Sequence, residues 1–320
     1  HYSAASLDEH DGALVNLTPS ESPRDIYQTV ADLATQKVKA ISEQPGDDQV
    51  HAKAWLDYGI SRKVCKRNTM TYAYSSGVYG FGDQLIADVM TPLGTLVLQG
   101  EITQHPFGDT SEVTSQAAKF LAKINMESIR EVISSAAAGM EFFKTIAGTL
   151  AHEGKPVRWT TPTGFTVVQK YSDFDMKKIK LYLHDRKAHV DRRTQVTVRE
   201  QSKNTINKRK SKASIAPNFI HSMDSAHLMK TVLVCRANGI TDFFLIHDSF
   251  ASTPPDTDLV YAAVRSAFVE MYDGFCMYQK FLDQARQQLS VQGCESLEVE
   301  IPKKGNLDLQ LILESEYCFA

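Results

Sequence analysis

Apolar residues recur at helical spacing in the first part of this 320-residue chain. The first such run follows a Pro-Ser-Glu-Ser-Pro break, and it predicts a helix from about residue 24 to residue 41. One face of that helix would carry Ile26, Val30, Leu33 and Val38. After a polar break, a second helical stretch includes Trp55 and ends at Gly59. The early part of the chain is therefore expected to be helical.

Longer helical stretches are predicted further along. Residues 111 to 150 are rich in Ala and predict a mostly helical region that mainly provides packing, with Gly139 and Gly148 as its interruptions or ends. Two further helices are predicted, one opening with Pro217 and Asn218 and closing at Gly239, the other from about residue 258 to residue 271.

Alternation of polar and apolar positions marks a different structure at about residues 172 to 200. Residues 177 to 183 and 194 to 200 both alternate, and a charged connection joins them, which predicts a long exposed hairpin. Its first strand would place Lys178, Lys180 and Tyr182 on one face.

A short apolar run, residues 243 to 246, leads directly to His247, Asp248 and Ser249. This order predicts a buried strand that turns tightly at the acid. A catalytic triad of the three is excluded, because neighbours on a strand point to opposite faces. Asp248 is then either a metal ligand held rigidly at a strand end or an Asp that caps the turn, and these residues alone favour the cap.

The net charge of -3 conceals a strong asymmetry. Residues 155 to 212 contain 16 Lys or Arg against 5 Asp or Glu, whereas the rest of the chain contains 19 against 33. A segment this basic favours a polyanion partner, since neutralising phosphates releases counterions and drives association. A solvated surface hairpin is the alternative.

The remaining composition is that of an ordinary soluble globular protein. The chain has no run of about 18 uncharged apolar residues and no signal-peptide pattern at its start, so we expect no membrane partner. Its five cysteines are odd in number and never spaced as CxxC. This spacing argues against a disulfide framework or a zinc site and favours a reducing compartment.

Four residues at successive i+4 steps suggest a nucleotide site. Arg62, Lys66, Met70 and Tyr74 would form one stripe on a helix, and that helix rises about 12 Å from Lys66 to Tyr74, comparable with the reach from a triphosphate to the ribose and base. The basic residues stand at the end where free N–H groups and the helix dipole favour anions. An ammonium there can neutralise or protonate a pyrophosphate leaving group, while Tyr74 meets the sugar. A solvated basic face is the alternative, but it leaves Tyr74 unexplained.

Three ordered segments resemble signature segments of single-subunit, bacteriophage-type RNA polymerases: RKVCKRNTMTYAY, APNFIHSMDSAHL and IHDSF. The likeness covers essentially the whole chain, from HYSA through PSESPRDIY and WLDYGISRKV to KGNLDL and ESEYCFA. It implies DNA-templated RNA synthesis and a mainly helical α+β fold, the fingers and palm of a right-hand polymerase. The palm would comprise residues 1 to 21 and 222 to 320, incomplete at its N-terminal side, and the fingers residues 22 to 221.

The resemblance also implies roles for single residues. Asp248 would be one of two metal-binding aspartates, and Lys66 would be the catalytic lysine of the fingers helix. Arg62 would assist with the triphosphate and Tyr74 would sense the ribose. Further substrate-binding groups would be Tyr27, His221 and Met70.

The basic hairpin resembles the family's promoter specificity loop, and a two-stranded ribbon fits the major groove of B-DNA. Its candidate DNA contacts are Lys178, Lys180, Tyr182, Arg193 and Gln195. The terminal Phe319 and Ala320 resemble the family's C-terminal foot beside the active site. Two positions depart from the family: Ser75 and Ala251 stand where Gly is usual, so the backbone after Tyr74 is expected to differ locally.

Two-metal phosphoryl transfer needs two carboxylates that bridge Mg²⁺ ions about 3.5 to 4 Å apart. In the family the other aspartate precedes the segment matching His1 to Ala4, so we expect the second ligand upstream of this chain and no normal catalysis by the chain alone. Asp8 and Asp11 fall after that segment and are not assigned to the metal site.

The implied partners are promoter DNA, the template strand, the RNA product, ribonucleoside triphosphates and the upstream portion of the polymerase. The implied location is the host cytoplasm for a phage enzyme or an organelle matrix otherwise. Two other classes remain. A right-hand DNA polymerase would share Lys66 and Tyr74, although the hairpin and His221 favour RNA synthesis. A non-catalytic nucleic-acid-binding module would have no use for Lys66, Tyr74 and Asp248 together.

Overall fold

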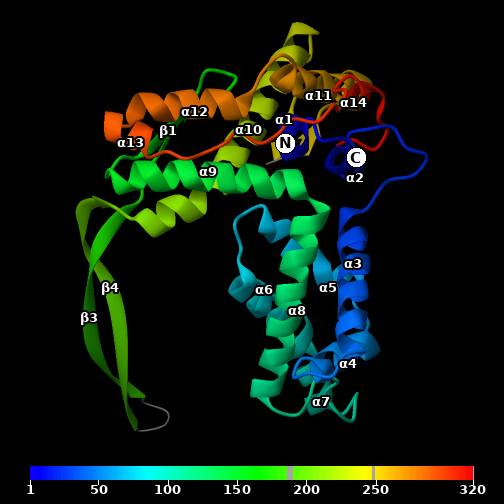
Figure 1. Cartoon of the computed structure of the whole chain (residues 1–320), viewed down its shortest axis with the longest axis vertical. Coiled ribbons are helices and arrows are strands. Elements are labelled where there is room, and N and C mark those ends of the chain that lie inside the picture. The colour runs from blue at the N-terminus through cyan, green and yellow to red at the C-terminus, as the bar shows by residue number, and fades with distance from the viewer. Residues whose placement is uncertain (186–189, 247–248, 320) are drawn as a thin grey trace.

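Helices in two groups make up most of the described chain (Figure 1). The computed structural model describes residues 1–185, 190–246 and 249–319. The lower group in Figure 1 contains α3 (Ile26–Ser42), α4 (Gln49–Tyr58), α5 (Arg62–Tyr72), α6 (Val78–Leu85), a π-helical turn (Ile86–Met90), α7 (Thr91–Gln99) and α8 (Ser111–Val132). The upper group contains α1 (Tyr2–Ser6), α2 (Glu9–Leu14), α9 (Ser134–His152), α10 (Lys208–Ala237), α11 (Thr257–Tyr272), α12 (Met277–Gln288), α13 (Val291–Glu295) and α14 (Leu311–Glu314).

The β-structure of the described residues is confined to three two-stranded antiparallel sheets. These pair β1 (Val157–Thr160) with β2 (Thr166–Gln169), β3 (Ser172–Asp185) with β4 (Val190–Ile206), and β5 (Phe244–Ile246) with β6 (Ser249–Ala251). The mainly helical α+β class is therefore confirmed. The helices predicted at about 24 to 41 and 258 to 271 are confirmed as α3 and α11, and the stretch ending at Gly59 is α4.

The prediction that Gly139 and Gly148 interrupt the helical region at 111 to 150 was wrong. The break falls at Ile133, between α8 and α9, and both glycines lie inside α9. Gly139 serves close packing: a Cβ there would lie 2.5 Å from the hydroxyl oxygen of Tyr278 and 2.8 Å from a ring carbon of Tyr2. The absent side chain lets α9 approach α1 and α12, which outweighs the poor helix propensity of glycine.

The helix expected to open at Pro217 begins nine residues earlier, at Lys208, so that prediction was also wrong. The side chain of Asn207 caps it by accepting a hydrogen bond from the N–H of Lys210 at 2.8 Å. Pro217 sits inside α10 and removes one helical hydrogen bond. Ile215, Ala216 and Phe219 are buried around it, and their packing holds the helix together.

The predicted hairpin is confirmed as β3 and β4, although its second strand runs on to Ile206. The ribbon projects away from the helices (Figure 1). Its register gives two unlike faces, because Lys178 lies opposite Thr197 while Ile179 lies opposite Val196. The apolar face, which also carries Leu181 and Leu183, is exposed to solvent.

The strand before Asp248 was predicted to be buried, and this prediction was wrong. Phe244 and Ile246 of β5 are 69% and 68% exposed. β5 pairs only with the short β6 among the described residues, so no second layer covers that face. Ala251 closes this pair opposite Phe244.

Two further observations concern the described helices and the cysteines. None of the described helices combines the length and apolarity needed to cross a bilayer. All five cysteines are free thiols, as their spacing predicted.

Candidate functional site

Helix α5 presents the predicted stripe to solvent. Its buried face consists of Val64, Cys65, Asn68, Thr69 and Tyr72. Arg62, Lys66 and Met70 lie on the exposed side. The stripe is therefore available to a ligand.

A buried polar network holds α5 in place, and the sequence analysis did not foresee it. The amide nitrogen of Asn68 donates to Gln84 at 2.8 Å, and its amide oxygen accepts from Asn125 of α8 at 2.9 Å. Asn68 and Asn125 are fully buried. The Asn125 oxygen in turn accepts from the thiol of Cys65 at 3.5 Å. Because both buried amides have hydrogen-bond partners, the network fixes the rotation of α5 and hence the direction of its exposed stripe.

Tyr74 was predicted to continue the helical stripe, but α5 ends at Tyr72 and Tyr74 lies in the following turn. The N–H of Ser76 donates to the carbonyl of Thr71 and that of Ser75 to the carbonyl of Tyr72, the hydrogen-bond pattern of a Schellman motif. This motif requires a left-handed residue, and Ser75 adopts φ 64°. The backbone thus keeps the conformation that glycine would take, with a Cβ added.

Ser75→Gly is expected to raise the free energy of unfolding by about 1 kcal/mol, because glycine removes the left-handed penalty. It also removes a buried hydroxyl that has no hydrogen-bond partner among the described residues. Urea denaturation measures the change. Ser76→Gly is the matched control, since Ser76 does not have a positive φ; an equal gain there would contradict the explanation.

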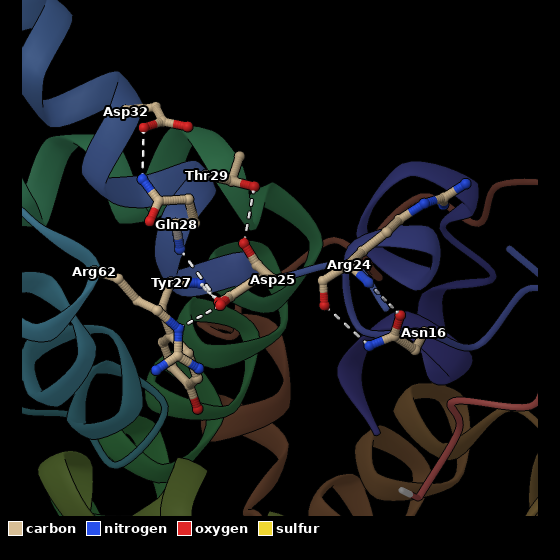
Figure 2. A network of polar contacts seen from close by, with 8 residues as sticks. All are labelled: Asn16, Arg24, Asp25, Tyr27, Gln28, Thr29, Asp32 and Arg62. Carbon is tan, nitrogen blue, oxygen red and sulfur yellow. Dashed lines mark hydrogen bonds and ion pairs between the residues drawn. The ribbon is translucent and has the colours of Figure 1, made fainter. Parts of the chain in front are cut away.

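Three side chains from α3 and α5 converge at the start of the stripe. The guanidinium carbon of Arg62 lies 5.1 Å and the ammonium of Lys66 5.6 Å from the centroid of the Tyr27 ring. Arg62 also donates from Nε to the carboxylate of Asp25 (Figure 2). Asp25 was missed in the sequence analysis, although an Asp directly before a predicted helix is the pattern of an N-cap.

Tyr74 and His221 meet at the other end of the stripe. Their ring centroids lie 5.0 Å apart, so α10 contacts the turn that follows α5. Burial raises the pKa of the Tyr27 hydroxyl, the Arg62 guanidinium lowers it, and the nearby carboxylate of Asp25 and phenol of Tyr74 raise it further. The predicted residues Tyr27, Arg62, Lys66, Tyr74 and His221 therefore form one cluster.

Asp248 and His247 lie outside the described residues, so the predicted metal ligand has no described geometry. A groove of about 670 Å³ lies beside the adjoining Ser249, and His1, Asp224 and Phe319 also line it. His1 binds Asp224 at 2.5 Å through Nε2. Phe319 and Ala320 were predicted to form a C-terminal foot. The Phe319 ring packs on His227 and Phe268, with ring centroids 5.2 and 5.1 Å apart. Ala320 lies outside the described residues.

His227 is buried behind this groove and is 3% exposed. Its Nε2 contacts the carbonyl oxygen of Val264 at 2.7 Å, and Phe250 and Phe268 pack against its ring. Burial lowers the pKa of His227 from 6.5 to about 4, with a smaller contribution from His1 in the same direction. The ring is therefore neutral at pH 7.

Acidification is expected to destabilise the fold through His227. Between pH 6.5 and about 4 the unfolded chain binds a proton that the folded chain does not. The free energy of unfolding should fall by about 3 kcal/mol as the pH is lowered through this window, and this contribution should level off below it. Urea denaturation across the window measures the slope. His227→Phe should remove about 3 kcal/mol of the loss, whereas His184→Gln on the exposed ribbon should not; equal slopes in all three proteins would contradict the assignment.

A compact group of Asp8, His10 and Asp11 has ligand atoms within 4.8 Å of one another. Its carboxylates already have structural partners. Asp8 caps α2 by accepting from the N–H of Asp11 at 2.9 Å. The buried carboxylate of Asp11 accepts from both the N–H and the hydroxyl of Ser135 at the start of α9. These contacts explain the two acids without a metal.

The ribbon gathers the five predicted DNA contacts on one face. The register places Lys180 opposite Gln195 and Tyr182 opposite Arg193, next to Lys178. The guanidinium of Arg193 lies 5.8 Å from the centroid of the Tyr182 ring. This face therefore carries cationic side chains and side chains that can form hydrogen bonds, contributed by both strands.

Comparison with known proteins gives a consistent picture. A family model described as DNA-dependent RNA polymerase matches residues 1–299. T7 RNA polymerase of Escherichia phage T7 is 33% identical over 354 aligned residues, covering 100% of this chain and 38% of that protein. DNA-directed RNA polymerase 2, chloroplastic/mitochondrial, of Arabidopsis thaliana is 30% identical, covering 100% of this chain and 29% of that protein. The chain thus spans well under half the length of these relatives.

Proposed function

Because the chain belongs to the DNA-dependent RNA polymerase family, we propose that it carries out DNA-templated RNA synthesis as part of a larger polymerase. In this proposal residues 22 to 221 form the fingers, with the ribbon as a specificity element. Residues 1 to 21 and 222 to 320 form the palm. The substrates are ribonucleoside triphosphates.

The observation that supports the proposal is the cluster along α5. Arg62 and Lys66 supply positive charge at one end, and Tyr74 packs against His221 at the other. A triphosphate would bind the cations, and the ribose would meet the aromatic pair. Lys66 would neutralise the pyrophosphate as it leaves, which is electrostatic stabilisation of charge that develops in the transition state. Met70, exposed between the two ends, would contact the nucleotide.

Mg²⁺ is the cofactor that the family implies, and Asp248 would be its ligand in this chain. When bound, Mg²⁺ would activate the 3′-hydroxyl and neutralise the leaving group. The described acids Asp8 and Asp11 do not fit this role, because Ser135 and the α2 cap occupy their carboxylates. The second carboxylate would come from polymerase sequence upstream of His1.

The basic face of the ribbon would contact promoter DNA. Lys178, Lys180 and Arg193 would neutralise phosphates, and Gln195 and Tyr182 can hydrogen-bond to base edges or the backbone. This division predicts that salt weakens binding through the cations while sequence preference depends on the neutral side chains.

The test is templated incorporation of labelled nucleotides by the polymerase that contains this chain. Asp248→Asn should abolish synthesis while DNA binding is retained, because a metal ligand is lost but no phosphate-binding cation is. Asp47→Asn, in the exposed turn before α4, is the matched control and should keep full activity. Loss of DNA binding in Asp248→Asn would contradict the assignment.

The same assay separates the alternative functions. Equal use of deoxynucleotides would indicate a right-hand DNA polymerase. DNA binding without any synthesis, and without dependence on Mg²⁺ or nucleotide, would indicate a binding module. Robust synthesis by the 320-residue chain alone would contradict the expectation that an upstream carboxylate is required.

A further inference from the structure

Asp25 links the start of α3 to the proposed triphosphate end of α5. One carboxylate oxygen accepts hydrogen bonds from the N–H groups of Tyr27 and Gln28, at 2.9 and 3.3 Å, and so caps α3. The other oxygen accepts from Nε of Arg62 (Figure 2). One side chain therefore performs two separable tasks, a cap and an ion pair.

The backbone around Asp25 is held on both sides. Before it, Asn16 bonds the backbone of Arg24 twice, accepting from its N–H at 2.8 Å and donating to its carbonyl at 3.1 Å. After it, the hydroxyl of Thr29 donates to the carbonyl of Asp25 at 3.1 Å (Figure 2). The carboxylate thus meets Arg62 from a fixed position rather than from a mobile loop.

The ion pair leaves the phosphate-binding part of Arg62 available. Asp25 takes the hydrogen bond from Nε, and the two terminal nitrogens make no hydrogen bond within the described part of the chain. The Tyr27 ring lies against the guanidinium at 5.1 Å. A guanidinium held at Nε and against a ring keeps its two terminal N–H groups aligned for a bidentate contact with phosphate oxygens.

The ionisation of Asp25 agrees with this arrangement. Burial alone would raise the pKa of its carboxyl, but hydrogen bonds from Arg62 and from the N–H groups of Gln28 and Tyr27 lower it below the usual value. The carboxylate is thus charged at neutral pH. The side chains of Asp25 and Arg62 are 34% and 45% exposed, so the pair contributes little to stability.

We propose that Asp25 is a positioning residue: its carboxylate fixes the guanidinium of Arg62 before the triphosphate binds. This inference rests on the proposed function, in which Arg62 binds the triphosphate. Its physical basis is entropy: an arginine already ordered by Asp25 and Tyr27 loses less side-chain freedom when phosphate binds.

The sign of the effect distinguishes positioning from simple electrostatics. A carboxylate beside a triphosphate repels it, so removing the charge alone should strengthen binding. Removing a positioning group should weaken binding, because Arg62 must then be ordered by the ligand. The two explanations predict opposite changes.

The decisive variant is Asp25→Asn, because asparagine caps a helix as well as aspartate does but cannot form the ion pair. With inorganic tripolyphosphate as the probe, calorimetric titration should give a dissociation constant about two- to tenfold higher than that of the wild-type chain. The thermal midpoint should stay unchanged. In the complete polymerase, KM for the ribonucleotide should rise by the same factor while kcat stays constant.

Asp32→Asn is the matched control. Asp32 lies on α3, the helix that Asp25 caps, and is an aspartate like Asp25. It accepts a hydrogen bond from Gln28 at 2.7 Å but does not contact Arg62 (Figure 2). Its removal should leave tripolyphosphate binding unchanged or slightly tighter. Weakening equal to that of Asp25→Asn would overturn the proposal.

The Arg62→Ala background separates the two levels of inference. If Arg62→Ala weakens binding and Asp25→Asn adds no weakening to it, the positioning role is supported. If Arg62→Ala weakens binding but Asp25→Asn alone does not, Asp25 has no positioning role and the proposed function stands. If Arg62→Ala binds as the wild type does, the triphosphate role of Arg62 fails and the role of Asp25 fails with it.

Discussion

Lys66→Met is expected to slow ribonucleotide incorporation by about 10²- to 10³-fold, the usual effect of removing one group that stabilises transition-state charge. The ammonium stands one helical turn after Arg62, on the exposed stripe of α5 and 5.6 Å from the Tyr27 ring centroid. Methionine keeps most of the length and none of the charge. Single-turnover nucleotide addition at saturating substrate measures the chemical step directly.

The control for Lys66 is its neighbour. Arg67 lies on the same helix but pairs with Asp88 at 2.6 Å, away from the Tyr27 cluster. Arg67→Met should change the rate by less than about twofold, because Arg67 pairs with Asp88 rather than with the groups proposed to bind the triphosphate, and an exposed ion pair contributes little to stability. Equal rate losses in the two variants would refute a specific role for Lys66 and favour a general electrostatic one.

Arg265→Ala is expected to lower the free energy of unfolding by roughly 3 to 5 kcal/mol, because several carbonyl oxygens would each lose a charged donor. Arg265 is 2% exposed. Its guanidinium donates to the carbonyls of Ser315, Glu316 and Cys318 near the C-terminus, and to that of Tyr261. Urea denaturation gives the stability, and hydrogen exchange reports whether residues 315 to 318 lose protection.

Two variants sharpen this test. Arg265→Lys keeps the charge but not the planar fork, so it should recover only a small part of the loss. Arg286→Ala, on the exposed side of α12, should cost less than about 0.5 kcal/mol. Full recovery by lysine would show that charge, rather than the array of hydrogen bonds, anchors the C-terminal segment.

How much of the cluster the sequence could predict depends on the range of the interactions. The stripe on α5 follows from residue spacing alone, and Arg62, Lys66 and Met70 are exposed as expected. Asp25 escaped notice because it contacts Arg62 across 37 positions, and no local pattern encodes such a distance. The buried hydrogen bond between Asn68 and Asn125 was missed for the same reason, since an Asn in a sequence predicts a surface position unless its partner is known.

Local rules failed where tertiary packing decided the outcome. Gly139 predicts a helix break, but the structure requires glycine there because Tyr2 and Tyr278 occupy the space that a side chain would fill. Pro217 reads as a helix start, but buried neighbours keep α10 intact on both sides of it. β5 reads as a buried strand from its apolar run, yet burial requires a second layer that a hydropathy pattern cannot supply.

The ribbon of β3 and β4, with one apolar and one basic face, should also affect the solubility of the purified chain. Each strand pairs on one side only within the described ribbon, and Ile179, Leu181 and Val196 face solvent. Such an edge is a template for pairing between molecules. Mutual repulsion of the lysines on the other face is expected to oppose this pairing, and 0.1 M salt screens that repulsion beyond about 10 Å. The solubility limit of this chain should therefore drop as ionic strength rises.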